Sequence, residues 1–462
     1  MTTFTPYAIS WNLTQRCNQK CAHCYLSAFP GASAARELST EECFSVMDEI
    51  AAVNPNVLLI LTGGEPLLRQ DIFDLGGYAA EKGFTVVLGT NGFLLREKHA
   101  TTMRQRGIAG ASISLDSTDP SRHDAFRRLP GAWRGAIQAT ELLRAEGLPF
   151  SLHMSITDWN VDEIPAMIDL ARESGAKVLN LFFLVRTGRG EGLTDITPEQ
   201  YERILTTLGR RRGVGPAPRP GSAEATRLGS VQAPRLGSAQ DDGETDDPWE
   251  TALGRAGDML IRAKCAPFFR RILYGLDPAS PLLRNYAEGS CPAGRHYCRI
   301  MPDGDVTACP YMPVVAGNLR QDPFDFLWRE AALFNDLRGG RLGGRCGVCE
   351  FSKVCGGCRC RAYATYGDYL AEDPACAYQP GAYGGHVIEL PAEQTFGIAA
   401  EPTLAWTADA QARLKRVPGF ARGMVIQAVE REARAREGGV VTAELMQEVR
   451  QRMLDRFPWF AS

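Results

Sequence analysis

The sequence lacks any long apolar run, any strong excess of one charge and any export signal. No stretch approaches the ~20 consecutive apolar residues that span a bilayer. The opening residues MTTFTPYAISWN contain neither a basic segment nor an apolar one of the kind that directs secretion. The formal net charge of −3 gives no sign of a nucleic-acid-binding surface. We therefore expect a cytoplasmic protein with no membrane span and no nucleic-acid partner.

Cysteine, by contrast, is plentiful and clustered. Fourteen cysteines in a small secreted domain would predict disulfides, but this chain has 462 residues and no export signal, which favours metal or redox chemistry. Twelve of them fall in two groups, Cys17 to Cys24 and Cys291 to Cys376. With 44% apolar and 23% charged residues, the composition is that of an ordinary globular protein with two or three domains.

Apolar runs alternate with helical patterns between residues 7 and 210. We expect helices near 39–53, 71–82, 96–106, 132–146, 161–174 and 197–210, and strands at 7–14, 56–65, 85–92, 111–116, 150–157 and 177–185. Six strands each followed by a helix imply a parallel sheet, because parallel neighbours need crossover connections. The fold class is therefore α/β, an open or partial (β/α)6 barrel, with function at the carboxyl ends of its strands.

Distinct motifs follow the first four strands. The loop RCNQKCAHCY places Cys17, Cys21 and Cys24 after the first strand, and TGGEP (62–66) ends the second. GTNG (89–92) and SLD (114–116) end the third and fourth. These motifs converge at one mouth of the barrel. A structural zinc closes its shell with four ligands, whereas three cysteines leave one position open.

The C-x3-C-x2-C spacing followed by GGEP resembles the radical S-adenosylmethionine superfamily over roughly residues 7 to 210. The resemblance implies a [4Fe–4S] cluster on Cys17, Cys21 and Cys24, whose fourth iron binds S-adenosyl-L-methionine. Reductive cleavage would release a 5′-deoxyadenosyl radical that takes a hydrogen atom from the substrate. Zinc completed by His23 is the alternative, but it leaves GGEP without a role.

The same resemblance implies the residues that contact the cofactor. Glu65 would receive the methionine amino group, and Gly63 and Gly64 would let the backbone approach. The remaining candidates are Tyr25 near the adenine, Asn91, Ser114 and Asp116 for ribose or carboxylate contacts, and Arg127 or Arg128 for the cofactor carboxylate. Asn91, Ser114 and Asp116 can also be explained as turn or strand-end residues.

The second cysteine group resembles the SPASM extension of these enzymes, with Cys291-x12-Gly304-x4-Cys309 followed by CGVCEFSKVCGGC. By that resemblance one auxiliary iron–sulfur cluster is held by Cys346, Cys349, Cys355 and Cys376. A second is held by Cys291, Cys309 and Cys358, with Cys298 as a candidate fourth ligand. Cys360 competes with Cys358, and the two glycines between Cys355 and Cys358 favour Cys358. Zinc on the two CxxC pairs is the alternative, and we expect Cys43 and Cys265 to be buried apolar residues.

Within that extension, the segments around Cys291 and Cys358 resemble enzymes that trim side chains of iron tetrapyrroles in the synthesis of haem and modified haem. This implies modification of propionate or acetate groups, with flavodoxin or ferredoxin as electron donor. Arginines 295, 299, 359 and 361, with His296, could face substrate carboxylates; the alternative is that they neutralise the clusters or lie in solvent. Competing hypotheses are a maturase acting on a ribosomal peptide and a non-catalytic iron–sulfur electron carrier.

These patterns divide the chain into four expected segments. We expect a catalytic partial barrel at 7–210, a flexible low-complexity insertion at 211–250 and the auxiliary iron–sulfur domain at 251–385. A small helical domain at 400–462 contains RLKRVPGFARGMV, which resembles the carboxy-terminal domain of the light-independent protochlorophyllide reductase B subunit.

Overall fold

The computed structural model describes residues 4–211, 248–256, 259–280, 283, 291–390, 401–417, 419–436 and 439–456. The insertion expected at 211–250 lies almost entirely outside these residues. Among the described residues no helix is long and apolar enough to cross a membrane.

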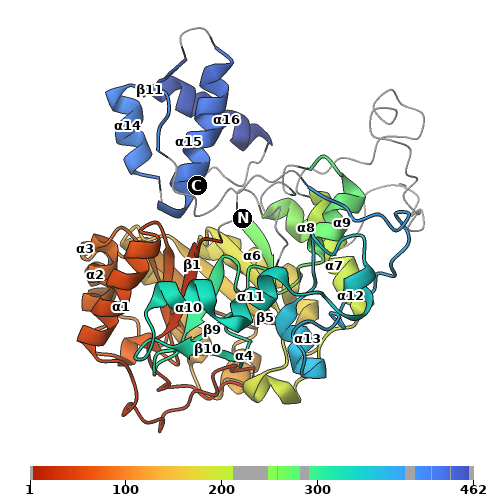
Figure 1. Ribbon diagram of the computed structural model, residues 1–462. Helices are drawn as coiled ribbons and strands as arrows, with labels where there is room; N and C mark the ends of the chain where they lie inside the picture. The colour runs from red at the N-terminus through yellow and green to blue at the C-terminus, as the bar shows by residue number, and fades with distance from the viewer. Residues whose placement is uncertain are drawn as a thin grey trace.

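Parallel strands form the catalytic part of the chain, and each of the six expected strands is present (Figure 1). Neighbours in sequence are neighbours in the sheet. The strands are β1 Ala8–Asn12, β2 Leu58–Thr62, β3 Thr85–Thr90, β4 Gly110–Ser114, β5 Phe150–Ile156 and β6 Val178–Phe183. The expected α/β partial barrel is thus confirmed.

Helices connect these strands and cover one face of the sheet. They are α1 Thr40–Val53, α2 Ile72–Glu81, α3 Glu97–Gln105, α4 Pro120–Arg127, α5 Ala132–Ala145, α6 Ile164–Ser174 and α7 Pro198–Arg211. Short 3-10 turns lie at η1 Pro66–Leu68, η2 Val161–Glu163 and η3 Gly188–Gly192. Ser39 caps α1 by accepting the Glu42 N–H, while Glu42 reaches back to the Ser39 backbone, as a capping box requires.

Two further strands extend the sheet beyond the expected six. Helix α8 (Pro248–Arg255) leads into β7 (Leu260–Lys264), which pairs in parallel with β6. On the other side β8 (Tyr297–Ile300) pairs in parallel with β1. The β7 sequence, LIRAK, carries an arginine and a lysine, so it did not stand out as an apolar run.

The cysteine-rich segment adds the remaining elements to this sheet. Strands β9 (Asp305–Thr307) and β10 (Val315–Asn318) continue it in antiparallel fashion from β8. Gly304 makes the turn between β8 and β9 at φ +90°, a conformation that favours glycine. The helices are α9 Phe269–Leu276, α10 Phe324–Glu330, α11 Ala332–Gly339, α12 Gly344–Val348 and α13 Arg359–Tyr366.

The carboxy-terminal segment has a core of its own. Its elements are β11 Ala405–Trp406, α14 Ala408–Lys415, α15 Gly419–Arg434, β12 Val440–Val441 and α16 Ala443–Arg456. Trp406, Leu414, Ile426 and Val429 are buried together there, separate from the barrel core. The expected helical character of the tail is present.

Candidate functional site

The loop between β1 and α1 carries Cys17, Cys21 and Cys24. Cys17 and Cys21 are buried and Cys24 is half-buried. The Gln19 N–H donates to Cys17 Sγ at 3.4 Å, and the Cys24 N–H donates to the Cys21 carbonyl at 3.4 Å, so local backbone bonds shape the loop. The structure therefore places the three thiols at the carboxyl end of β1, where the parallel sheet predicts a site.

The GGEP segment packs directly against this loop. The Gly64 N–H donates to the Thr14 carbonyl at 2.6 Å, and the Glu65 N–H donates to the Arg16 carbonyl at 2.8 Å. A Cβ on Gly64 would lie 2.2 Å from the Arg16 oxygen. Glycine is therefore required at position 64 because the backbone here lies against the backbone of the cysteine loop.

Glu65 is fully buried between the ends of β2 and β3. Its Oε1 accepts the Thr90 hydroxyl at 2.7 Å and the Leu67 N–H at 3.1 Å, and its Oε2 accepts the Asn91 N–H at 2.9 Å. Burial raises the pKa of the carboxyl, and these three donors oppose that rise. A cationic ligand arriving at this carboxylate would compensate the buried charge.

Asn91 joins the Glu65 segment to the cysteine loop. Its side-chain amide donates to Asn18 Oδ1 at 2.8 Å and lies 4.0 Å from Cys17 Sγ. The GTNG motif therefore reaches the thiols, as expected from its position at a strand end.

Asp116 and Arg127, both candidates for cofactor contacts, pair with each other. Arg127 donates through Nε and Nη2 to Asp116 Oδ2 at 2.7 and 2.6 Å, and its Nη1 lies 3.8 Å from Cys21 Sγ. Asp116 Oδ1 accepts the Ser155 N–H at 3.0 Å, and its side chain is 0% exposed. Asp116 thus accepts from protein donors through both oxygens, while Arg127 donates to Asp116 and reaches the Cys21 sulfur, so the pair connects the end of β4 to the cysteine loop. Arg128, the other candidate, is exposed.

Tyr25 and Ser114 remain on the open side of this arrangement. The Tyr25 hydroxyl accepts the Asn12 side-chain amide at 3.0 Å, and its ring packs edge-on against Tyr311 with centroids 5.3 Å apart. Ser114 is half-exposed at the end of β4. Of these candidates, Asn91 approaches a thiol of the loop, and it also donates its backbone N–H to Glu65.

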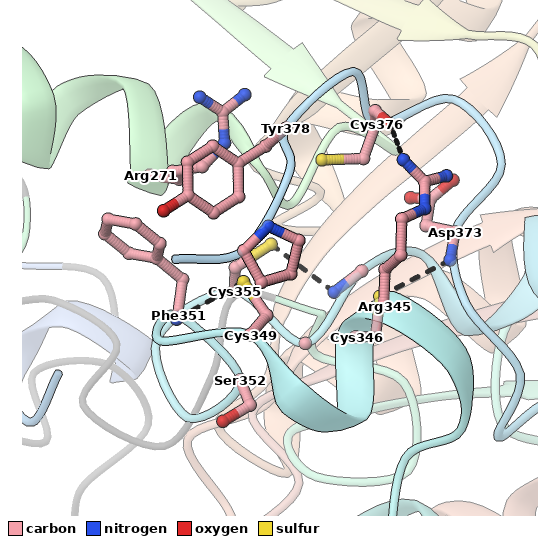
Figure 2. A pocket seen from close by; sticks show the side chains of 13 residues that line it. Arg271, Arg345, Cys346, Cys349, Phe351, Ser352, Cys355, Asp373, Cys376 and Tyr378 are labelled. Carbon is pink, nitrogen blue, oxygen red and sulfur yellow. Dashed lines mark hydrogen bonds between the residues drawn. The ribbon is translucent and has the colours of Figure 1, made fainter. Parts of the chain in front are cut away.

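A second group of cysteines surrounds a pocket in the auxiliary segment (Figure 2). Three of its sulfurs accept hydrogen bonds from backbone N–H groups, each at 3.4 Å. The donors are Phe351 for Cys349, Gly357 for Cys355 and Asp373 for Cys346. The lining includes Arg271, Arg345 and Tyr378, together with the outer cysteines, a name used here for Cys346, Cys349, Cys355 and Cys376. This is the set expected to hold one auxiliary cluster.

A third group, the inner cysteines, comprises Cys265, Cys291, Cys309 and Cys358, with Cys360 beside them. Burial raises the pKa of the Cys265 thiol, and the negative charges of Cys358, Cys309 and Cys291 raise it further. Its backbone stands at φ +61°, a strained conformation for a non-glycine residue. Cys265 packs against the main core, as expected of an apolar residue, and the charges of other cysteines also act on its thiol, which makes it a further candidate ligand.

Cys298, the candidate fourth ligand, lies in a different environment. It is fully buried on β8, and its register partner is Ile9 of the core. Tyr297, on the opposite face of the strand, is the residue whose pKa responds to Cys309. Because side chains alternate along a strand, Cys298 points away from the inner cysteines.

Cys358 belongs to the inner cysteines, and Cys360 lies beside them. Cys358 caps α13 and Cys360 lies in its first turn, with its thiol hydrogen-bonded to Cys309 and Cys358. The preceding glycines adopt φ +66° and +68°, and a Cβ on Gly357 would meet Asp373 Cβ at 2.8 Å. The tight glycine turn expected between Cys355 and Cys358 is therefore present.

The arginines beside the auxiliary cysteines are used by the protein itself. Arg299 donates to Thr307, Pro310 and Met312, and Arg359 to the carbonyls of Tyr369 and Ala371. Arg361 pairs with Asp373 and donates to the Cys265 carbonyl at 2.9 Å. Arg295 donates to the Leu337 carbonyl at 3.2 Å, and His296 is mostly buried against Tyr7. These contacts with backbone carbonyls and Asp373 show that the side chains support the cysteine-rich segment, a role that the sequence did not indicate.

The donor set fits iron–sulfur clusters. Burial raises the pKa of Cys17 to about 12, and of Cys291 and Cys376 to about 11, so these thiols need a bound cation to become thiolates. Within the described ranges no three Cys, His, Asp or Glu side chains stand close enough to hold one metal ion. A cluster is larger than an ion, and its cysteines stand around a hollow as the outer cysteines do.

Comparison with known proteins gives a consistent result. Residues 11–171 match the Radical SAM superfamily, residues 291–359 an iron–sulfur cluster-binding domain called SPASM, and residues 406–450 the proto-chlorophyllide reductase 57 kD subunit.

Two relatives and one solved structure illustrate the likeness. The AdoMet-dependent heme synthase of Methanosarcina barkeri is 35% identical over 82% of this chain and 98% of its own. The Fe-coproporphyrin III synthase of the same organism is 30% identical over 80% of this chain and 87% of its own. Streptococcus suis SuiB bound to S-adenosylmethionine shares the fold, with a TM-score of 0.59 and 14% identity over 81% of this chain and 78% of that one.

Proposed function

The chain belongs to the radical S-adenosylmethionine superfamily, alongside the AdoMet-dependent heme synthases, and from this premise we propose that it modifies carboxylate side chains of an iron tetrapyrrole. The observation that carries the proposal is the 35% identity to a heme synthase over 98% of that relative's length. The likeness of the tail to a protochlorophyllide reductase subunit points to the same substrate class.

The three thiols of the first loop would hold the catalytic cluster. Cys17, Cys21 and Cys24 supply three ligands and leave one iron open for S-adenosyl-L-methionine. When bound, this cluster and its ligand supply the 5′-deoxyadenosyl radical that abstracts hydrogen from the substrate.

The surrounding side chains would position the cofactor. Glu65 receives its amino group, since it is a buried carboxylate whose pKa burial raises and a cation would compensate. Tyr25 lies on the adenine side, and Asn91 and Ser114 lie within reach of the polar groups. Arg127 and Asp116 act indirectly, because they hold the segment that carries Cys21 in place.

The two auxiliary groups would each hold one iron–sulfur cluster. The outer cysteines surround a pocket and accept backbone N–H bonds, which also tune a cluster's potential. The inner cluster takes Cys265 as its fourth ligand in place of Cys298. A flavodoxin- or ferredoxin-type protein is the proposed electron donor, and the cytoplasm the proposed location.

Turnover on a panel of candidate substrates tests this function. Anaerobically reconstituted protein, reduced and supplied with S-adenosyl-L-methionine, is expected to convert iron coproporphyrin III or a siroheme-type tetrapyrrole to a product of changed mass, with 5′-deoxyadenosine formed in step. The triple replacement of Cys17, Cys21 and Cys24 by alanine is the matched control. Absence of 5′-deoxyadenosine from the wild type would indicate an electron carrier, and conversion of a peptide but no tetrapyrrole would indicate a maturase.

A further inference from the structure

A buried hydrogen-bond donor at the pocket of the outer cysteines has no acceptor within the part of the chain that the structure describes. Arg271, on α9, lines this pocket and is 9% exposed. Its Nε–H makes no hydrogen bond to a described protein group. A buried donor without an acceptor is destabilising, so such a group in a folded protein indicates a ligand to which it donates.

The rest of the guanidinium is held by protein groups. Its Nη2 pairs with the carboxylate of Glu202, which lies on α7. The guanidinium also lies over the ring of Tyr378, with 5.0 Å between its Cζ and the ring centroid (Figure 2). Because a guanidinium is planar and rigid, these two contacts also fix the direction of its Nε–H.

The charge of Arg271 acts on the outer cysteines. Burial raises the pKa of Cys376 to about 11 and also raises the pKa of Cys349, and the Arg271 charge opposes both shifts. Burial lowers the pKa of Arg271 itself, but the charges of Glu202, Cys376 and Cys355 outweigh it and raise that pKa. The guanidinium is therefore a permanent positive charge beside these sulfurs.

Arg345, which lines the same pocket, is by contrast occupied by protein acceptors. Its Nε donates to Glu372 at 3.2 Å, and its Nη1 donates to the Cys376 carbonyl at 3.0 Å. The sulfurs of the outer cysteines in turn have backbone donors, since Cys376 accepts from the Tyr378 backbone as the other three accept from theirs. The Nε–H of Arg271 is thus available for an acceptor that the protein itself does not supply.

We propose that Arg271 donates its Nε–H to the iron–sulfur cluster of the outer cysteines and raises the reduction potential of that cluster. A cluster gains one negative charge when it takes up an electron, so a neighbouring cation that is also a donor stabilises the reduced form more than the oxidised form. This inference rests on the outer cluster of the proposed function and deepens it. It does not depend on which substrate the protein modifies.

The test is a reductive titration of the anaerobically reconstituted full chain, followed by electron paramagnetic resonance. The signal that is missing from Cys346→Ala/Cys349→Ala belongs to the outer cluster. Arg271→Met is expected to lower the midpoint potential of this signal by about 59 mV or more, a tenfold change in the reduction equilibrium. Arg255→Met is the matched control, since Arg255 pairs with Asp169 on the surface, and it should leave the potential unchanged.

Two further variants separate the hydrogen bond from the charge. Arg271→Lys keeps the charge and its pairing with Glu202 but has no Nε–H, so a smaller shift in the same direction is expected. In Arg271→Met/Glu202→Gln both charges of the ion pair are removed, so the net charge at the pocket equals that of the wild type. The double variant should still have a potential below the wild-type value, because the donor to the cluster is lost.

Equal potentials in the wild type and the double variant, at equal iron content, would overturn the inference. An unchanged potential in both Arg271→Met and Arg271→Lys would do the same. A wild type without an outer-cluster signal would overturn the outer cluster itself and the inference with it. The expected shifts in a protein that converts no tetrapyrrole would instead support the inference and overturn the proposed substrate.

Discussion

Asp373 accepts the backbone N–H of Cys358 at 2.7 Å and so links the two auxiliary cysteine groups. Its own backbone N–H donates to Cys346 Sγ at 3.4 Å, which places one residue between an inner and an outer cysteine. The carboxylate is 1% exposed and pairs with Arg361 at 3.2 Å. The two groups are thus fixed relative to one another by a buried ion pair.

Replacing Asp373 by asparagine should therefore destabilise the protein and lower its auxiliary iron content. The change removes the nearer of the two carboxylates beside the buried Arg361 and leaves Asp195, 3.8 Å from its Nε, as the remaining counter-ion. Breaking a buried ion pair costs up to about 3–5 kcal/mol. Urea unfolding followed by circular dichroism, together with iron analysis, measures both effects. Asp325→Asn is the control, since Asp325 faces Arg329 across one turn of an exposed helix and should cost at most about 1 kcal/mol. Equal losses in both variants would contradict the linking role.

Cys265→Ala should lose one cluster's worth of iron, roughly four atoms per chain for a four-iron cluster. Cys298→Ala should keep its iron, because Cys298 faces the core away from the other thiols. Iron analysis and electron paramagnetic resonance on the two anaerobically purified variants distinguish the sites. A deficit in Cys298→Ala with full iron in Cys265→Ala would restore the original ligand assignment.

Cys358 and Cys360 lie two residues apart, so the iron contents of their alanine variants can be compared directly. Cys358→Ala should lose about one cluster's iron and Cys360→Ala little, because the glycine turn delivers Cys358 to the group while Cys360 already belongs to helix α13. The same iron and resonance measurements apply. Full iron in Cys358→Ala combined with a deficit in Cys360→Ala would reverse the roles.

The sequence predicted the elements that follow from local patterns. Alternating apolar runs located β1 to β6, and the spacing of Cys17, Cys21 and Cys24 located the first loop. Strand β7 was missed because LIRAK is short and charged. Cys265 was not proposed as a ligand because an isolated cysteine belongs to no recognisable spacing motif. Its proximity to Cys358 depends on the tertiary fold. The role of Cys298 stayed open because a strand's register, which the sequence does not contain, decides the face to which its side chain points.

The contacts of the charged residues were also not predictable from local sequence patterns. The pairing of Arg127 with Asp116 could not be predicted, because it depends on how α4 lies against the end of β4. A buried arginine donates to whatever acceptors surround it, and the sequence does not show those acceptors. The arginines near the auxiliary cysteines were ambiguous for this reason until their carbonyl partners were visible.

Arg127→Met should reduce occupancy of the first cluster site and destabilise the protein by about 3–5 kcal/mol, because Asp116 is left buried without its counter-ion. Arg128→Met, one residue along and exposed, is the matched control and should behave like the wild type. Iron content, the unfolding midpoint and the dissociation constant of S-adenosyl-L-methionine are measured for both. A variant with normal iron and stability but weakened cofactor binding would show that Arg127 contacts the cofactor directly.

Transfer of deuterium from the substrate to 5′-deoxyadenosine tests the central claim most directly. Iron coproporphyrin III deuterated along its propionate side chains is incubated with the reduced protein and S-adenosyl-L-methionine, and the nucleoside product is analysed by mass spectrometry. The account predicts 5′-deoxyadenosine that carries deuterium, in proportion to the tetrapyrrole converted. Nucleoside free of deuterium, formed beside an unchanged tetrapyrrole, would contradict it.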